Sequence, residues 1–124
     1  FADWKQAEID YYRRTGIFPI MHAVGVRTSL LKAEPWLAMS LFKAFTQAKS
    51  VALDRLATPH AVVLPWAVEA LAEARALMGN DIWPYGIAAN RKAIEAVLAW
   101  SRADGLHQKP LAIEGLFAGA LLMT

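Results

Sequence analysis

The sequence lacks the residues that several classes of protein require. None of its 124 residues is cysteine, which excludes disulfides, thiolate metal sites and cysteine nucleophiles. Its 13 basic and 11 acidic residues are scattered and leave a net charge of +2, whereas a nucleic-acid surface needs a basic face or stripe. The longest uncharged runs are well short of the ~20 residues that cross a bilayer. We therefore predict no nucleic-acid partner and no membrane span.

Standard catalytic signatures are absent as well. The chain has no phosphate-binding loop, no G-x-S-x-G turn, no H-E-x-x-H helix and no dinucleotide fingerprint. Its three histidines, His22, His60 and His107, are too far apart in the sequence to form a local metal-binding motif. The sequence thus predicts neither a metal site nor a bound cofactor.

What the chain does have is apolar residues, 56% of the total, and one strong strand signal. Residues 17–27 (IFPIMHAVGVR) are almost continuously apolar, which is typical of a strand buried on both faces of an α/β sheet. A single strand cannot satisfy its own backbone groups, and no convincing second strand is present. We therefore expect the chain to be a piece of a larger protein. Phe1 in place of an initiator methionine points the same way, although processing also produces such a start.

The rest of the sequence predicts helices, because apolar residues recur at three- and four-residue steps. The predicted helices cover residues 4–15, 36–55, 65–78 and 87–103, with short turns after Thr28 and after Pro110. We expect the apolar stripe of residues 36–51 to form part of the core, with Lys49 outside it. On the helix of residues 87–103, we expect Arg91 to pair with Glu95. The chain is thus predicted to be mostly α with one strand, like the later part of an α/β domain.

His22 is the first candidate functional residue, because it lies within the predicted buried strand. A polar side chain there must be hydrogen-bonded, and an imidazole can act as general acid or base near neutral pH. The alternative is a structural histidine bonded to a backbone carbonyl, and the sequence leaves both open. Arg27, at the end of the strand, has a guanidinium that fits a carboxylate, or it is merely a solvated surface residue.

The second candidate is residues 81–86 (DIWPYG), which we call the aromatic loop. Trp83 and Tyr85 flank a proline, and a glycine follows. Stiff aromatic loops of this kind line pockets for flat organic ligands, with the Tyr85 hydroxyl as a polar contact. The alternative is that both rings only fill the gap between two helices.

Short groups of residues along nearly the whole chain, from about residue 11 to residue 117, match the pattern of a known protein family. They are residues 17–22 (IFPIMH), 35–36 (PW), 40–41 (SL), 44–45 (AF), 48–49 (AK), 64–66 (LPW), 73–75 (EAR), 78–79 (MG), 83–86 (WPYG) and 90–91 (NR). In their order and spacing, these residues resemble the 4,5-dihydroxyphthalate decarboxylase family.

This resemblance implies an α/β parent fold like that of type II periplasmic solute-binding proteins, with two lobes around a ligand cleft. Residues 1–124 would be a single C-terminal segment of such a protein. Residues 1–27 would supply a helix and a crossover strand, and residues 28–124 would pack as helices on the first lobe. The missing N-terminal part of the same protein would complete the ligand site.

The family name implies a carboxy-lyase that removes one carboxylate from a dihydroxylated aromatic dicarboxylate, converting 4,5-dihydroxyphthalate to protocatechuate. His22 would be its acid or base, Tyr85 a phenol partner, and Arg27 an anchor for the substrate carboxylate. One alternative is a solute-binding component of a transporter for a small organic anion. Another is a helical interaction module without a ligand. An enzyme would be cytoplasmic and a solute-binding protein periplasmic.

Overall fold

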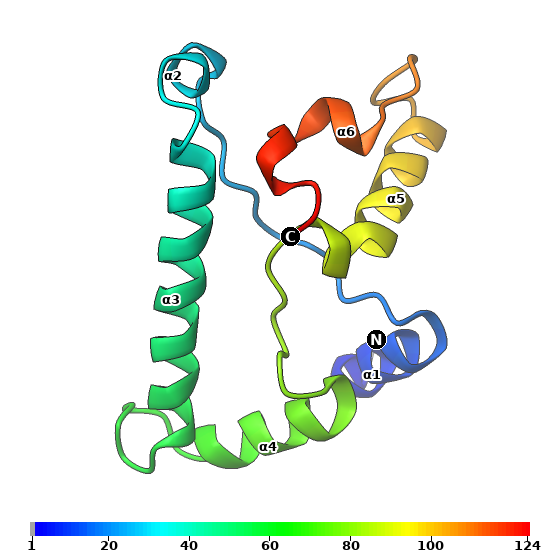
Figure 1. Ribbon diagram of the computed structural model, residues 1–124. Coiled ribbons are helices and arrows are strands. Elements are labelled where there is room, and N and C mark those ends of the chain that lie inside the picture. Colours follow the sequence, from blue (N-terminus) through cyan, green and yellow to red (C-terminus); the bar gives the residue numbers. More distant parts are fainter. Residues whose placement is uncertain (1) are drawn as a thin grey trace. The chain divides into compact units, whose positions relative to one another are not determined.

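The structure is a computed structural model that describes residues 2–124, and Phe1 lies outside the described residues. The described chain is built from helices (Figure 1). In chain order these are α1 (Trp4–Thr15), α2 (Thr28–Ala33), α3 (Leu37–Ala57), α4 (Ala67–Met78), α5 (Ile87–Ala103), α6 (Ile113–Leu116) and the 3-10 turn η1 (Gly119–Leu121). None of the described helices combines the length and apolar character that crossing a membrane requires.

Helix α1 shows how local signals set the helix ends. The Asp3 carboxylate accepts a hydrogen bond from the backbone N–H of Gln6 at 2.9 Å and so caps the first turn. Gly16 ends the helix in the left-handed conformation (φ 64°), and its N–H donates to the carbonyl of Tyr12. The predicted bounds of α1 and α5 are confirmed.

The two other long helices differ slightly from their predicted bounds. Helix α3 ends at Ala57, directly before the predicted stop at Thr58 and Pro59. Helix α4 begins at Ala67 rather than at Pro65, because the intervening Trp66 has a left-handed backbone (φ 60°) that cannot continue a right-handed helix.

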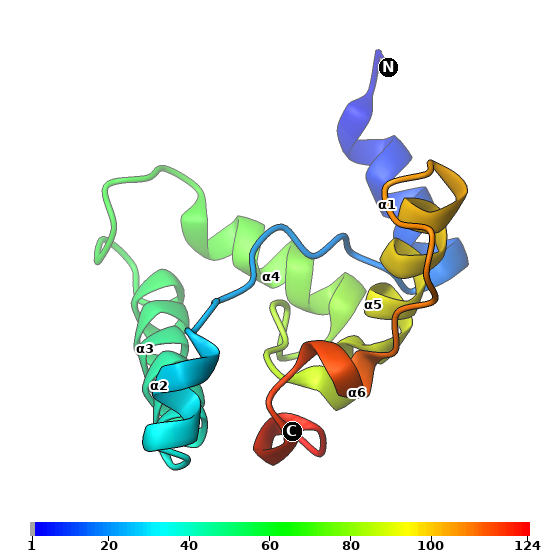
Figure 2. The same ribbon diagram turned by 90° about the horizontal axis from the view of Figure 1, so that it is seen from above.

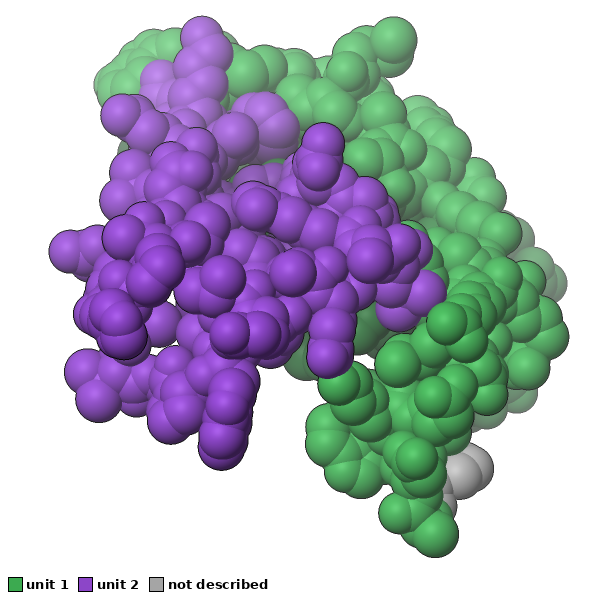
Figure 3. Space-filling model, turned by 90° about the horizontal axis from the view of Figure 1, so that it is seen from below, with its two compact units in different colours: residues 1–39, 85–124 green, residues 40–84 purple. Residues whose placement is uncertain are grey.

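The chain divides into two compact units, coloured separately in Figure 3: residues 1–39 with 85–124, and residues 40–84. The core of the first unit is formed by the buried Ile87, Ile94 and Ile113 from α5 and α6. Leu98, Phe117, Leu121 and Leu122 pack on these three side chains. Helices α5 and α6 lie side by side in both ribbon views, as this shared core requires (Figures 1 and 2).

The last residues of the chain return to the beginning of α5. The backbone N–H of Ala88 donates a hydrogen bond to the carbonyl of Thr124 at 2.6 Å. Gly86 precedes α5 with a φ of 94°, and a Cβ at this position would lie 2.7 Å from the carbonyl carbon of Thr124. Both the backbone conformation and the close approach therefore require glycine here.

The second unit, residues 40–84, contains most of α3 and all of α4. Ala67 and Leu71 are buried and lie four residues apart, on one face of α4. The unit ends in the first four residues of the aromatic loop.

The predicted strand is wrong for this chain. Residues 16–27 have no regular secondary structure, and no strand occurs in residues 2–124. The physical reason is that a strand exists only when a neighbour bonds its backbone groups, and the described residues supply none. The predicted burial is wrong too: Ile17 is buried, but Met21 and Val24 are 61% and 66% exposed. Residues 17–27, which we call the apolar segment, are left largely uncovered.

The predicted core stripe of residues 36–51 is also largely exposed. Trp36, Phe45 and Val51 all present large exposed apolar surfaces, and among the residues of this stretch only Ala38 is buried. The periodicity identified the apolar face of α3 correctly, but the described residues do not cover that face.

Candidate functional site

His22 lies in the apolar segment and is exposed rather than buried. The prediction that its ring would be hydrogen-bonded inside the protein is therefore wrong for this chain, because the ring makes no hydrogen bond within residues 2–124. Arg27 is also exposed, and its carbonyl begins α2 by accepting hydrogen bonds from the N–H groups of Leu30 and Leu31. Its guanidinium makes no ion pair with any described residue. Both side chains are thus open to solvent.

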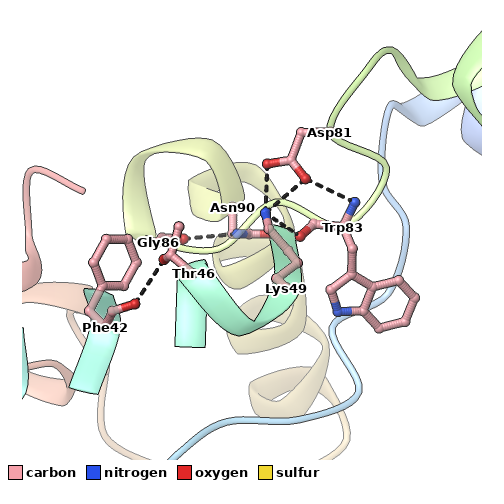
Figure 4. Close-up of polar contacts among 7 residues, drawn as sticks. All are labelled: Phe42, Thr46, Lys49, Asp81, Trp83, Gly86 and Asn90. Carbon is pink, nitrogen blue, oxygen red and sulfur yellow. Dashed lines mark hydrogen bonds and ion pairs between the residues drawn. The ribbon is translucent and has the colours of Figure 1, made fainter. Parts of the chain in front are cut away.

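Tyr85 lies two residues before the start of α5 and is exposed. The residue after it, Gly86, is held by Asn90 from the first turn of α5: the Asn90 side-chain amide donates to the Gly86 carbonyl at 2.8 Å (Figure 4). The end of the aromatic loop is therefore fixed to the helix that follows it.

The beginning of the aromatic loop is held by Lys49 of α3 (Figure 4). The Lys49 ammonium donates to both carboxylate oxygens of Asp81 at 2.8 Å and to the backbone carbonyl of Trp83 at 3.0 Å. The Asp81 carboxylate also accepts a hydrogen bond from the Trp83 N–H at 3.3 Å. We call these three residues the Lys49 clamp. The Lys49 side chain is only 13% exposed, but the Asp81 side chain is 54% exposed, so water still reaches one side of this ion pair.

The structure does not bring His22, Arg27 and Tyr85 into one pocket. The first unit has a hollow of about 270 Å³ beside Arg91 and Glu114, and another of about 320 Å³ beside Thr28 and η1. None of the three predicted residues lines either hollow. No hydrogen bond or ion pair joins any two of them in the described part of the chain.

Arg91 forms the polar contacts between α5 and α6. The predicted pair with Glu95 is confirmed at 3.7 Å, and Arg91 also reaches Glu114 at 3.2 Å. A hydrogen bond from its own backbone N–H, and then the Arg91 guanidinium, hold the pKa of the Glu114 carboxyl below its ordinary value of 4.5. Both contacts favour the charged form, so this pair helps to dock α6 at neutral pH.

The remaining histidines do not build a metal site. Among the described residues, no three His, Asp or Glu side chains are grouped so that they could hold a metal ion. The ring nitrogens of His107 lie 2.8 Å from the carbonyl of Lys109 and 3.2 Å from that of Leu98. His107 is thus a structural residue at the end of α5, and His60 is exposed in the turn before α4.

A 4,5-dihydroxyphthalate decarboxylase from Comamonas testosteroni is 43% identical to this chain over 124 residues, which cover 98% of the chain. The chain is homologous to that enzyme. The resemblance predicted from the sequence is therefore confirmed. No protein-family model matches the chain.

The chain spans only 38% of the length of the decarboxylase, so it corresponds to a portion of that protein. The match covers almost the whole chain, so it extends over the apolar segment and the aromatic loop.

The role of Lys49 was not predicted from the sequence. Lys49 was expected only to lie outside the apolar stripe of α3, yet it makes three hydrogen bonds to the aromatic loop. No local pattern links positions 49 and 81, since the contact joins residues 32 apart. The only available signal was the spacing of Asp81 and Trp83, which suits a side-chain-to-backbone turn.

Proposed function

We propose that this chain is part of a decarboxylase-like protein that removes one carboxylate from 4,5-dihydroxyphthalate, or from a closely related dihydroxylated aromatic dicarboxylate. The observation that carries the proposal is the 43% identity to a 4,5-dihydroxyphthalate decarboxylase over nearly all of the chain. The product from 4,5-dihydroxyphthalate is protocatechuate.

In the complete protein, we propose that the apolar segment becomes a crossover strand of an α/β fold with two lobes, and that this chain is its C-terminal segment. Two observations support this proposal. The apolar segment has exposed apolar side chains and no strand partner within residues 2–124. The Nε of Arg75 is buried and has no hydrogen-bond partner in the same residues, although buried donors are normally bonded. Additional chain in the complete protein would pair with the apolar segment and would provide a hydrogen-bond acceptor for the Arg75 Nε.

The proposed reaction needs no oxidant or reductant. The carbon–carbon bond to one carboxylate breaks, carbon dioxide leaves, and the ring carbon gains a proton. A deprotonated hydroxyl on the ring makes that carbon electron-rich, and a positive charge holds the second carboxylate in place. The proton donor must reach the ring carbon directly or through one water.

We propose that His22 transfers the proton and that Tyr85 contacts a hydroxyl of the substrate. Arg27 binds the carboxylate that the substrate retains. These assignments are supported by side-chain chemistry and exposure. His22 and Arg27 make no side-chain hydrogen bond or ion pair within residues 2–124, so their polar groups remain available to a ligand. Arg27 offers the planar pair of donors that a carboxylate accepts.

The test uses the full-length protein that contains this chain, incubated with 4,5-dihydroxyphthalate in D₂O. We expect release of carbon dioxide and a product with one deuterium at the carbon that lost its carboxylate. His22→Gln should lower kcat by about 10²- to 10⁴-fold, the usual contribution of a general acid. His60→Asn is the matched control, because His60 is exposed and asparagine tolerates its left-handed backbone.

Two outcomes would contradict the assignment. Equal activity of His22→Gln and His60→Asn would remove His22 from the chemistry. Tight binding of the diacid without release of carbon dioxide would favour the solute-binding alternative, and a periplasmic rather than cytoplasmic location would then be expected.

A further inference from the structure

Arg75 lies on the inner face of α4, in the second unit. Ala67 and Leu71 of the same helix are buried, and Arg75 continues their four-residue spacing. Side chains at this spacing share one face of a helix, and on a face that packs inward they are usually apolar. Arg75 is partly buried there, and its Nε is fully buried. An ionised side chain thus occupies a position where an apolar one is expected.

The guanidinium of Arg75 has no partner within residues 2–124. Its buried Nε makes no hydrogen bond, and no described residue forms an ion pair with it. An arginine stays protonated in proteins, so its charge cannot be relieved by loss of a proton. A buried donor without an acceptor and a charge without a counter-charge both cost free energy. Arg75 therefore needs an acceptor that the described residues do not supply.

The other partly buried cation of residues 40–84 has the partners that Arg75 lacks. Lys49 donates to both carboxylate oxygens of Asp81 and to the carbonyl of Trp83 in the Lys49 clamp. The two remaining cations of this unit, Lys43 and Arg55, are exposed to water. Arg75 is thus the exception in its unit, and Lys49 shows that a carboxylate is the group that satisfies such a cation there.

From these observations we propose that Arg75 binds the carboxylate of an acidic side chain in the further chain of the complete protein. The parallel N–H groups of a guanidinium match the two oxygens of a carboxylate, which also balances the charge, whereas a backbone carbonyl would leave the charge uncompensated. The acceptor belongs to the protein rather than to a ligand, because packed residues cover the Nε and a diffusing ligand needs an open approach. The inference rests on the proposal that this chain is part of a longer protein, and not on the decarboxylase reaction. The chain spans 38% of the decarboxylase, which leaves ample further chain to carry such a residue.

The experiment measures thermal unfolding of the full-length protein at neutral pH. Arg75→Met should lower Tm by several degrees, because it leaves a buried carboxylate without its partner. Arg75→Lys should lower Tm less, since an ammonium restores the charge but not the pair of parallel donors. The matched control is Arg55→Met, which replaces an exposed arginine of α3 in the same unit and should leave Tm nearly unchanged.

Acid distinguishes a carboxylate from a neutral acceptor. As the pH falls, the unpaired carboxyl of Arg75→Met takes up a proton and no longer needs a counter-charge. The difference in Tm between the wild type and Arg75→Met should therefore shrink as the pH falls to about 4 and below. Double-mutant cycles with Asp→Asn and Glu→Gln substitutions in the further chain should then show strong coupling to Arg75 at one position.

The inference fails if Arg75→Met leaves Tm unchanged or raises it, because the guanidinium then has no partner in the complete protein either. It also fails if the loss of Tm persists in acid, which would assign a backbone carbonyl as the acceptor. An unchanged Tm with weaker binding of 4,5-dihydroxyphthalate would assign the carboxylate to the ligand and overturn the inference as well. If Arg75→Met does not fold, Arg75→Lys carries the same test. The decarboxylase proposal fails separately, since it depends on release of carbon dioxide and not on these Tm values.

Discussion

Helices α5 and α6 and the apolar segment are both rich in apolar residues, yet only the helices form a core. Ile87, Ile94 and Ile113 bury one another, and the turns around α6 pack against them. The apolar segment is also rich in large side chains, yet Ile20, Met21 and Val24 remain exposed and only Ile17 is buried. The difference therefore does not lie in hydrophobicity.

The difference lies in where each element finds its partners. A helix satisfies its backbone internally and needs only side-chain cover, which α6 supplies to α5 from about ten residues further along the chain. A strand needs both backbone partners and side-chain cover, and both come from distant parts of a sequence. A portion of a protein can thus keep a helical core and leave a strand segment without structure. We propose that the exposed apolar surface of this segment is where further chain packs in a longer protein.

The largest expected effect comes from breaking the helical core. Ile94→Ala should lower the free energy of unfolding by about 2–5 kcal/mol, because it removes three buried carbon atoms and leaves a cavity between α5 and α6. Denaturant unfolding of the 124-residue chain measures the change. Val97→Ala is the matched control on the same helix, because Val97 is largely exposed, and it should cost well under about 1 kcal/mol. If both variants lowered the free energy of unfolding equally, Ile94 would not contribute to a packed core.

The second prediction tests the apolar segment in two contexts. Val24→Asp should change the stability of the 124-residue chain by no more than about 0.5 kcal/mol, because Val24 is exposed there. In the full-length protein the same substitution should be severely destabilising, because it would place a charge inside a paired strand. Thermal unfolding of both proteins measures the contrast. A full-length protein that tolerates Val24→Asp would contradict the crossover strand.

The sequence predicted the helices of this chain well, because their signals are local. Gly16, Pro59 and Gly79 mark ends that the structure places within one or two residues. It failed at the apolar segment and at the face of α3, where periodicity reports which side is apolar but not whether anything covers it. Among the candidate site residues, local sequence identified His22, Arg27 and Tyr85 by chemistry alone. It could not find Lys49, whose role depends on a contact with a distant loop.

The smallest expected effect concerns the polar contact that accompanies the helical core. Because the folded state lowers the pKa of Glu114, its carboxylate stabilises the fold above the ordinary value of 4.5, and this contribution is lost as the pH falls through the lower folded-state pKa. Glu114→Gln should therefore be slightly less stable than the wild type near neutral pH, and the difference should vanish in acid. Thermal unfolding across this pH range measures it, with Glu8→Gln on the exposed face of α1 as the control. If Glu114→Gln remained less stable than the wild type in acid, the charge of Glu114 would have no part in docking α6. The docking would then depend on the apolar cluster and on the shape of the side chain.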